Sequence, residues 1–209
     1  MIRFAQLRRS LPLVALMLAA AAPAAAQFDP SGSWRTFHTT HFRVHAREYL
    51  SDVARAAARE AERAYALLAR ELEPPRPPID LVLADNHDLS NGFATPFPSN
   101  RFAVYVTPPT QTSSLNNFDS WLRLVITHEL THVFHLDRAE GVWGGLQSAL
   151  GRAPILFPNA YQPPWVAEGI ATYYESRFTR AGRIHGAFHR QILTATASDG
   201  NWQGIGVGR

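Results

Sequence analysis

His128-Glu129-Leu130-Thr131-His132, written HELTH, lies in an apolar stretch of this chain of 209 residues, and the expected fold is built around it. An α-helix has about 3.6 residues per turn, so His128 and His132 share one helix face and can offer ring nitrogens to one metal ion. Glu129 stands beside the first histidine, where its carboxylate can take a proton from a metal-bound water. Catalytic zinc keeps three protein ligands and one open position, so a further ligand must come from downstream.

A second motif follows on the C-terminal side, Trp165-Val166-Ala167-Glu168-Gly169. HELTH followed by WVAEGIATYYE resembles the gluzincin zinc peptidases, the branch that includes thermolysin and aminopeptidase N-like enzymes. In that family a glutamate on the next helix is the third metal ligand, a role that the resemblance gives to Glu168. Trp165, Gly169 and Tyr173 match the W-x-x-E-G-x-x-x-Y frame of the aminopeptidase-like enzymes.

The stretch from HELTHVFHLDRA through GRAPILFPNAYQPPW is similar to exported bacterial peptidase MA-like domains, which often continue into a β-propeller. The resemblance implies an α+β, zincin-like fold: a small N-terminal mixed sheet with helices, the HEXXH helix and a following Glu-bearing helix. It also implies Zn²⁺ as the metal and a peptide or protein as the substrate. The peptide bond would be hydrolysed by a zinc-activated water, with Glu129 as general base. By the same resemblance, the strand Phe102–Thr107 would be the edge strand that pairs with substrate.

Two features depart from the family pattern. The connection from His132 to Glu168 is longer than in thermolysin and aminopeptidase relatives, and no element matches the part of an aminopeptidase that grips the free amine of its substrate. The assignments therefore rest on the two motifs and not on their spacing. A domain of this kind that stops at Arg209 would be truncated, without the propeller.

Glu175 is a candidate for a supporting role at the metal. It lies seven residues after Glu168, hence on the same helix face, and can accept the second N–H of a ligating histidine. A glutamate in this role also occurs in aminopeptidase-like relatives. The alternative is a solvated surface charge.

Other histidines and tyrosines receive less specific expectations. His135 is expected to pack, and Asp137 to interact near the end of its helix. The histidines of strands and loops lack ligand spacing and are expected to be structural: His38, His41, His45 and His87. The group that stabilises an oxyanion stays open among Tyr173, Tyr174, His185, His189 and a residue beyond the chain.

Simpler interpretations of the motifs also stand. HELTH can occur by chance on a buried helix, and Glu168 can be a salt-bridge partner or a charge near a helix N-terminus. Two other functions compete with a peptidase. One is a non-catalytic envelope module that binds or scaffolds on a zincin fold, against which the intact Glu129 argues; the other is a zinc hydrolase of a non-peptide substrate.

The first 26 residues resemble a signal peptide. Arg3, Arg8 and Arg9 are followed by the apolar run Leu11 to Ala22 and by Ala24-Ala25-Ala26, so we expect cleavage after Ala26 and a periplasmic or secreted protein. An uncleaved anchor is the alternative, although the run is shorter than the roughly 20 residues of a spanning helix. No cysteine follows, which argues against a lipid anchor, disulfides and a thiol nucleophile.

The remainder, residues 27–209, is expected to form one domain. The signal segment holds three of the 20 basic residues and none of the 17 acidic ones, so the rest is near neutral and shows no nucleic-acid-binding pattern. Hydrophobic and turn patterns predict strands at Thr36–His45, Ile79–Ala84 and Phe102–Thr107, and helices at Glu48–Glu73, Phe118–Leu136, Trp165–Phe178 and Ile184–Thr196. Asn117 or Asp119 would cap the HELTH helix. The apolar segment 137–164 is expected to be a packed connection, with a cleft wall or partner-docking surface as the alternative.

Overall fold

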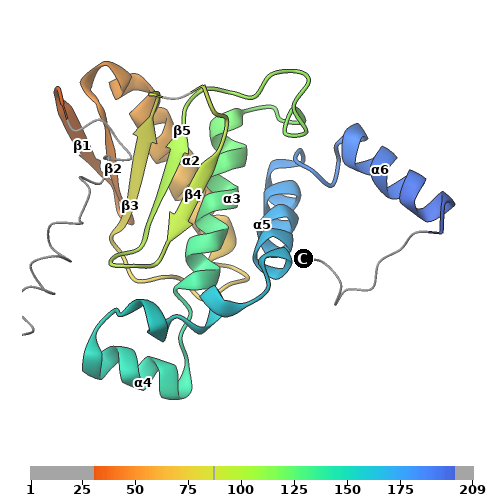
Figure 1. Cartoon of the computed structure of the whole chain (residues 1–209). Helices are drawn as coiled ribbons and strands as arrows, with labels where there is room; N and C mark the ends of the chain where they lie inside the picture. The colour runs from red at the N-terminus through yellow and green to blue at the C-terminus, as the bar shows by residue number, and fades with distance from the viewer. Residues whose placement is uncertain (1–30, 87, 201–209) are drawn as a thin grey trace, which may run out of the picture. The chain divides into compact units, whose positions relative to one another are not determined.

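A mixed five-stranded sheet forms the N-terminal half of the computed structural model, which describes residues 31–86 and 88–200 (Figure 1). The predicted signal peptide and His87 lie outside the described residues. The strand order is β1-β2-β3-β5-β4. The strands are β1 Trp34–His38, β2 Phe42–Arg47, β3 Ile79–Ala84, β4 Gly92–Thr95 and β5 Arg101–Tyr105. The three central strands β2, β3 and β5 run parallel, and the edge strands β1 and β4 run antiparallel to their neighbours.

Helices occupy most of the remaining chain. After the short 3-10 turn η1, Glu48–Leu50, come α2 Ser51–Leu68, α3 Trp121–Leu136, α4 Gly141–Leu150, α5 Pro164–Thr179 and α6 Ala187–Ser198. Two more 3-10 turns, η2 Pro154–Leu156 and η3 Pro158–Tyr161, lie between α4 and α5. The fold is therefore α+β, as predicted. None of the helices in the described part of the chain combines the length and the apolar character needed to cross a bilayer.

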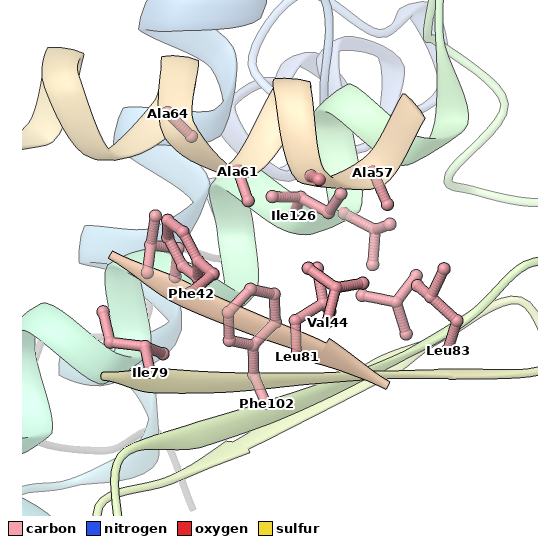
Figure 2. Packing of buried hydrophobic residues seen from close by; sticks show 14 of the residues in the cluster. Phe42, Val44, Ala57, Ala61, Ala64, Ile79, Leu81, Leu83, Phe102 and Ile126 are labelled. Atoms are coloured by element: carbon pink, nitrogen blue, oxygen red, sulfur yellow. The ribbon is translucent and has the colours of Figure 1, made fainter. Parts of the chain in front are cut away.

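The core lies between one face of the sheet and the helices α2 and α3. Alternate residues of β2 and β3 are buried, which is the pattern of strands with one packed face. Helix α2 lays small buried side chains over them, and Figure 2 shows Ala57, Ala61 and Ala64 above Phe42 and Phe102. Because alanine lets the backbones approach closely, α2 packs tightly on the parallel strands.

Helix α3, which carries HELTH, is buried on nearly every side. It packs against α2, α5 and the strands β4 and β5 (Figure 1). Its N-cap is Ser120, whose hydroxyl accepts a hydrogen bond from the Arg123 N–H, so the predicted caps Asn117 and Asp119 are wrong. The indole N–H of Trp121 donates to the Tyr105 carbonyl at 2.9 Å and ties the start of α3 to β5.

Several predicted boundaries are wrong for local reasons. The single strand predicted at Thr36–His45 is a hairpin, because the chain turns at Thr39, whose N–H donates to the Phe42 carbonyl. The predicted helix Glu48–Glu73 opens with a 3-10 turn and ends at Leu68. Helix α4, inside the predicted connection, was not predicted. It is free of charged residues and places Val142 and Leu150 in solvent.

The predicted edge strand Phe102–Thr107 is not at an edge. It corresponds to β5, which lies between β3 and β4. The edge strand next to β5 is β4, for which no strand was predicted. Its sequence GFAT is short and shows no alternation, and Asn91 before it forms with Gly92 an Asn-Gly pair typical of turns, so no local pattern predicts a strand there.

Candidate metal centre

Two histidine rings from consecutive turns of α3 face a carboxylate from α5. The Nε2 atoms of His128 and His132 lie 3.2 Å apart. The carboxylate of Glu168 lies 3.4 Å from the first Nε2 and 3.5 Å from the second. These three residues form a group that could hold a metal ion.

The separations suit a small tetrahedral site. Metal–ligand bonds of about 2.0–2.1 Å place neighbouring tetrahedral ligands about 3.3–3.4 Å apart. The 3.2 Å between the two Nε2 atoms lies close to that value, and the two Glu168 oxygens lie at similar distances from the rings: Oε2 is 3.4 Å from Nε2 of His128 and Oε1 is 3.5 Å from Nε2 of His132. The donor set of two imidazoles and one carboxylate, without sulfur, also matches what zinc and similar divalent ions accept in proteins. The residues present therefore fit a metal ion bound by three protein atoms.

Neighbouring elements hold the three side chains in place. His128 and His132 lie inside α3, whose burial leaves their side chains only 7% and 11% exposed. Glu168 lies in the second turn of α5, and its side chain is 58% exposed, so it closes the site from the solvent side. Because α3 and α5 pack along their length, HELTH and the WxxEG motif meet although 35 residues separate His132 from Glu168.

Glu175 lies behind the first histidine. It is fully buried, so it is not a solvated surface charge. Its Oε2 lies 2.7 Å from Nδ1 of His128, in a contact without the alignment of a regular hydrogen bond. Oε1 accepts the Arg183 backbone N–H at 3.1 Å. A carboxylate at Nδ1 favours the tautomer that leaves Nε2 free to bind a metal.

Arg183 was not predicted and adds a cation to this cluster. Its Nη1 donates to the Thr172 hydroxyl at 2.9 Å and lies 3.6 Å from Oε2 of Glu175. The loop that carries it turns at Gly182, with φ of 82°, where a Cβ would lie 3.0 Å from Oε1 of Glu175. The sequence gives no sign of this role, because Arg183 lies in a loop eight residues after Glu175 and outside both motifs.

Glu129 projects from α3 toward the edge strand β4. A Cβ on Gly92 would lie 2.6 Å from Cγ of Glu129, so only glycine leaves room for the glutamate. Burial raises the pKa of Glu129 above its usual range, and the nearby carboxylate of Glu168 adds to the rise. His128 and His132 oppose it. A carboxyl group with a raised pKa suits proton transfer near neutral pH.

The metal residues and Glu129 line one cleft of about 420 Å³. One wall is the start of β4, from Asn91 to Ala94, and the other is the segment before α5, with Asn159, Ala160 and Gln162. Part of the connection 137–164 is thus a cleft wall, the alternative considered from the sequence.

The remaining residues singled out in the sequence lie elsewhere. None of the four described oxyanion candidates lines the cleft. Tyr173 and Tyr174 line a separate apolar hollow with Leu72 and Trp165, and His185 and His189 lie on or before α6. His135 lies outside the metal group, with its Nε2 3.1 Å from Oε1 of Gln162.

Asp137, His41 and His45 have partners within the fold. Asp137 pairs with Arg152 at the end of α3. His41 lies against Glu62, and His45 lies between Thr36 and Asp80.

Comparison with known proteins adds no relative. No protein-family model matches the chain, and no curated protein sequence matches it significantly. The site is therefore interpreted from its own geometry.

The carboxylates around His128 predict that metal binding releases protons. Burial lowers the pKa of His128, but the contacts with Glu168 and Glu175 outweigh it and raise that pKa to about 9 in the metal-free protein. His128 is then protonated at pH 7, and a metal ion must displace that proton, so affinity falls as pH decreases below about 9, by up to about tenfold per pH unit. Calorimetry in buffers of different ionisation enthalpy measures the protons released.

Glu175→Gln tests the cause. It should reduce the protons released at pH 7 and weaken metal binding by about 10- to 100-fold. Glu62→Gln, which alters the contact of Glu62 with His41 outside the cleft, is the matched control and should change neither quantity. Wild-type affinity in Glu175→Gln would contradict the assigned contact.

Proposed function

We propose that this chain is an exported, zinc-dependent metallopeptidase with a zincin-like fold of the gluzincin type. The observation that carries the proposal is the convergence of His128, His132 and Glu168 beside the buried Glu129 in one cleft. The donor set favours zinc among the divalent ions. The export part of the proposal rests on the N-terminal sequence alone.

Different residues of the cleft would have different roles in hydrolysis. His128, His132 and Glu168 would hold the zinc ion, and Glu175 would orient the ring of His128. A zinc ion held there would lower the pKa of a water and polarise the substrate carbonyl. Glu129 takes a proton from the attacking water and later gives it to the leaving amine, for which a raised pKa is favourable. No described residue of the cleft is assigned to the oxyanion.

The edge strand β4 supports a peptide substrate. The Tyr105 N–H donates to the Asn91 carbonyl, so the hydrogen-bonded pairs of this antiparallel ladder continue at Phe93 and Thr95. The backbone groups of Gly92 and Ala94 therefore face away from β5 at the open edge. An extended peptide can pair with them and pass beside Glu129. β4 replaces β5 as the strand proposed to bind substrate.

Glu129→Gln tests the chemistry directly. The variant should bind zinc as the wild type does and lose cleavage of a quenched-peptide library by at least about 100-fold, because a general base contributes about 10²–10⁴-fold. Glu140→Gln, an exposed glutamate outside the cleft, is the control and should keep wild-type activity.

The remaining outcomes decide between the proposed function and its rivals. Equal turnover by wild type and Glu129→Gln would refute the assignment of Glu129. Zinc binding without peptide cleavage by either protein would refute the peptidase and favour a binding module or a non-peptide hydrolase.

Ala94→Pro tests the proposed role of β4. Proline at this position removes an N–H that faces the open edge and leaves the β4–β5 ladder intact. One lost backbone bond of about 1 kcal/mol should raise KM for extended peptides by about fivefold, with little change in kcat. Ala94→Ser keeps the N–H and should behave as wild type. A proline variant with unchanged KM would argue against pairing along β4.

A further inference from the structure

Three segments of the chain meet at the guanidinium of Arg152. Asp137 comes from the end of α3, Asn100 and the Pro96 carbonyl from the turn between β4 and β5, and Phe157 from the segment before α5. We call Arg152, Asp137, Asn100 and the Pro96 carbonyl the Arg152 clamp.

Each nitrogen of Arg152 is used. Nη1 donates to Oδ1 of Asp137 at 2.7 Å, Nη2 donates to Oδ1 of Asn100 at 2.6 Å, and Nε donates to the Pro96 carbonyl at 3.1 Å. Nη2 also donates to the Pro96 carbonyl. The face of the guanidinium lies over the buried ring of Phe157, 4.9 Å from its centroid. The planar group is thus fixed along its edge and on one face.

The side chains of Asn100 and Asp137 also form hydrogen bonds with other parts of the chain. The Asn100 amide donates to Oδ2 of Asp137 at 2.8 Å and to the Arg76 carbonyl. The Arg76 backbone N–H donates to the same Oδ2. Asn100 is 3% exposed and the Asp137 side chain 7%, so these bonds form in a region of low solvent content. Asp137 is therefore held in a fixed position at the C-terminal end of α3.

The Arg152 clamp lies close in sequence to both walls of the cleft. Pro96 follows Ala94, a residue of the β4 wall, by two positions. Phe157 precedes Asn159, a residue of the opposite wall, by two positions, and Asp137 follows the lining residue Leu136. A displacement of the Arg152 guanidinium would therefore shift residues that are only one or two positions away from both walls in the sequence.

Stability alone does not account for this arrangement. A buried ion pair adds little net stability, because the desolvation of both charges offsets their attraction. Well-packed apolar side chains could join the same segments equally firmly, but would not fix their spacing by directed bonds. The guanidinium sets distances to three acceptors at once, which a lysine with its single ammonium cannot reproduce.

We propose that Arg152 is a positioning residue that fixes the separation of the two cleft walls, and with it the fit of an extended substrate between β4 and the segment before α5. The part of this inference that concerns substrate rests on the proposed peptidase function. The part that concerns the walls rests only on the contacts described above.

The test compares Arg152→Lys and Arg152→Met with Arg138→Lys and Arg138→Met. Arg138 is a nearby exposed arginine that pairs with Glu140, so it controls for the loss of a local charge. Hydrogen exchange of the backbone amides of 93–95 and 155–162 measures wall mobility without any need for activity. Both Arg152 variants should exchange at least about tenfold faster in both segments, because they lose the directed hydrogen bonds that hold these segments. The Arg138 variants should match the wild type.

Kinetics and metal binding then separate a positioning role from general destabilisation. Arg152→Lys should raise KM for extended peptides by about tenfold, change kcat by less than about threefold, and bind zinc with wild-type affinity. Unchanged exchange in either wall, or equal losses in zinc affinity, kcat and KM, would overturn the inference. Absence of peptide cleavage by the wild type would refute the proposed function, while the exchange data would still decide whether Arg152 fixes the walls.

Discussion

The fully buried carboxylate of Glu175 lies against Nδ1 of His128 in the interface between α3 and α5. A buried carboxylate without partners is costly, so the arrangement persists only where donors and a cation surround it. His128 supplies one contact, and Arg183 supplies a backbone N–H and a guanidinium. This requirement aligns the two helices along their length. The same alignment brings Glu168 opposite the two histidine rings. The geometry of His128, His132 and Glu168 therefore depends on the contact between Glu175 and the far side of the His128 ring.

The sheet contributes the other side of the site through a steric constraint. Strand β4 passes so close to α3 that Gly92 has no room for a side chain above Glu129. The glutamate is consequently buried and confined, and its pKa is raised by that burial. Because β4 is also an edge strand of the sheet, the confined carboxylate lies next to backbone groups that face away from β5. The proposed proton transfer and the proposed pairing with a peptide would therefore share one cleft.

Local sequence patterns predicted the helices and strands in which the spacing of apolar residues repeats along the whole element. The α+β class, the buried strand Ile79–Ala84 and the helices that carry HELTH and Glu168 were predictable, because apolar spacing extends through each of them. Glu175 could be placed because it shares a helix face with Glu168. The distances between α3 and α5 depend on tertiary packing, which no local pattern contains.

The features that escaped prediction are set by contacts between distant segments. Strand β4 forms because β5 offers it a partner, although its sequence is typical of a turn. Arg183 and Arg152 acquire their partners from helix ends and turns far away in the chain. The oxyanion candidates were predicted from residue type alone. The orientation of α5 places Tyr173 in the separate hollow beside Trp165 and outside the cleft.

A crystal structure of the zinc-loaded chain, with zinc located by anomalous scattering, tests the central claim most directly. The account predicts one zinc ion about 2.0–2.2 Å from Nε2 of His128, Nε2 of His132 and a carboxylate oxygen of Glu168. Its fourth position should hold a water on the side of Glu129. A zinc ion bound elsewhere, or bound to the histidines with Glu168 turned away, would contradict the account.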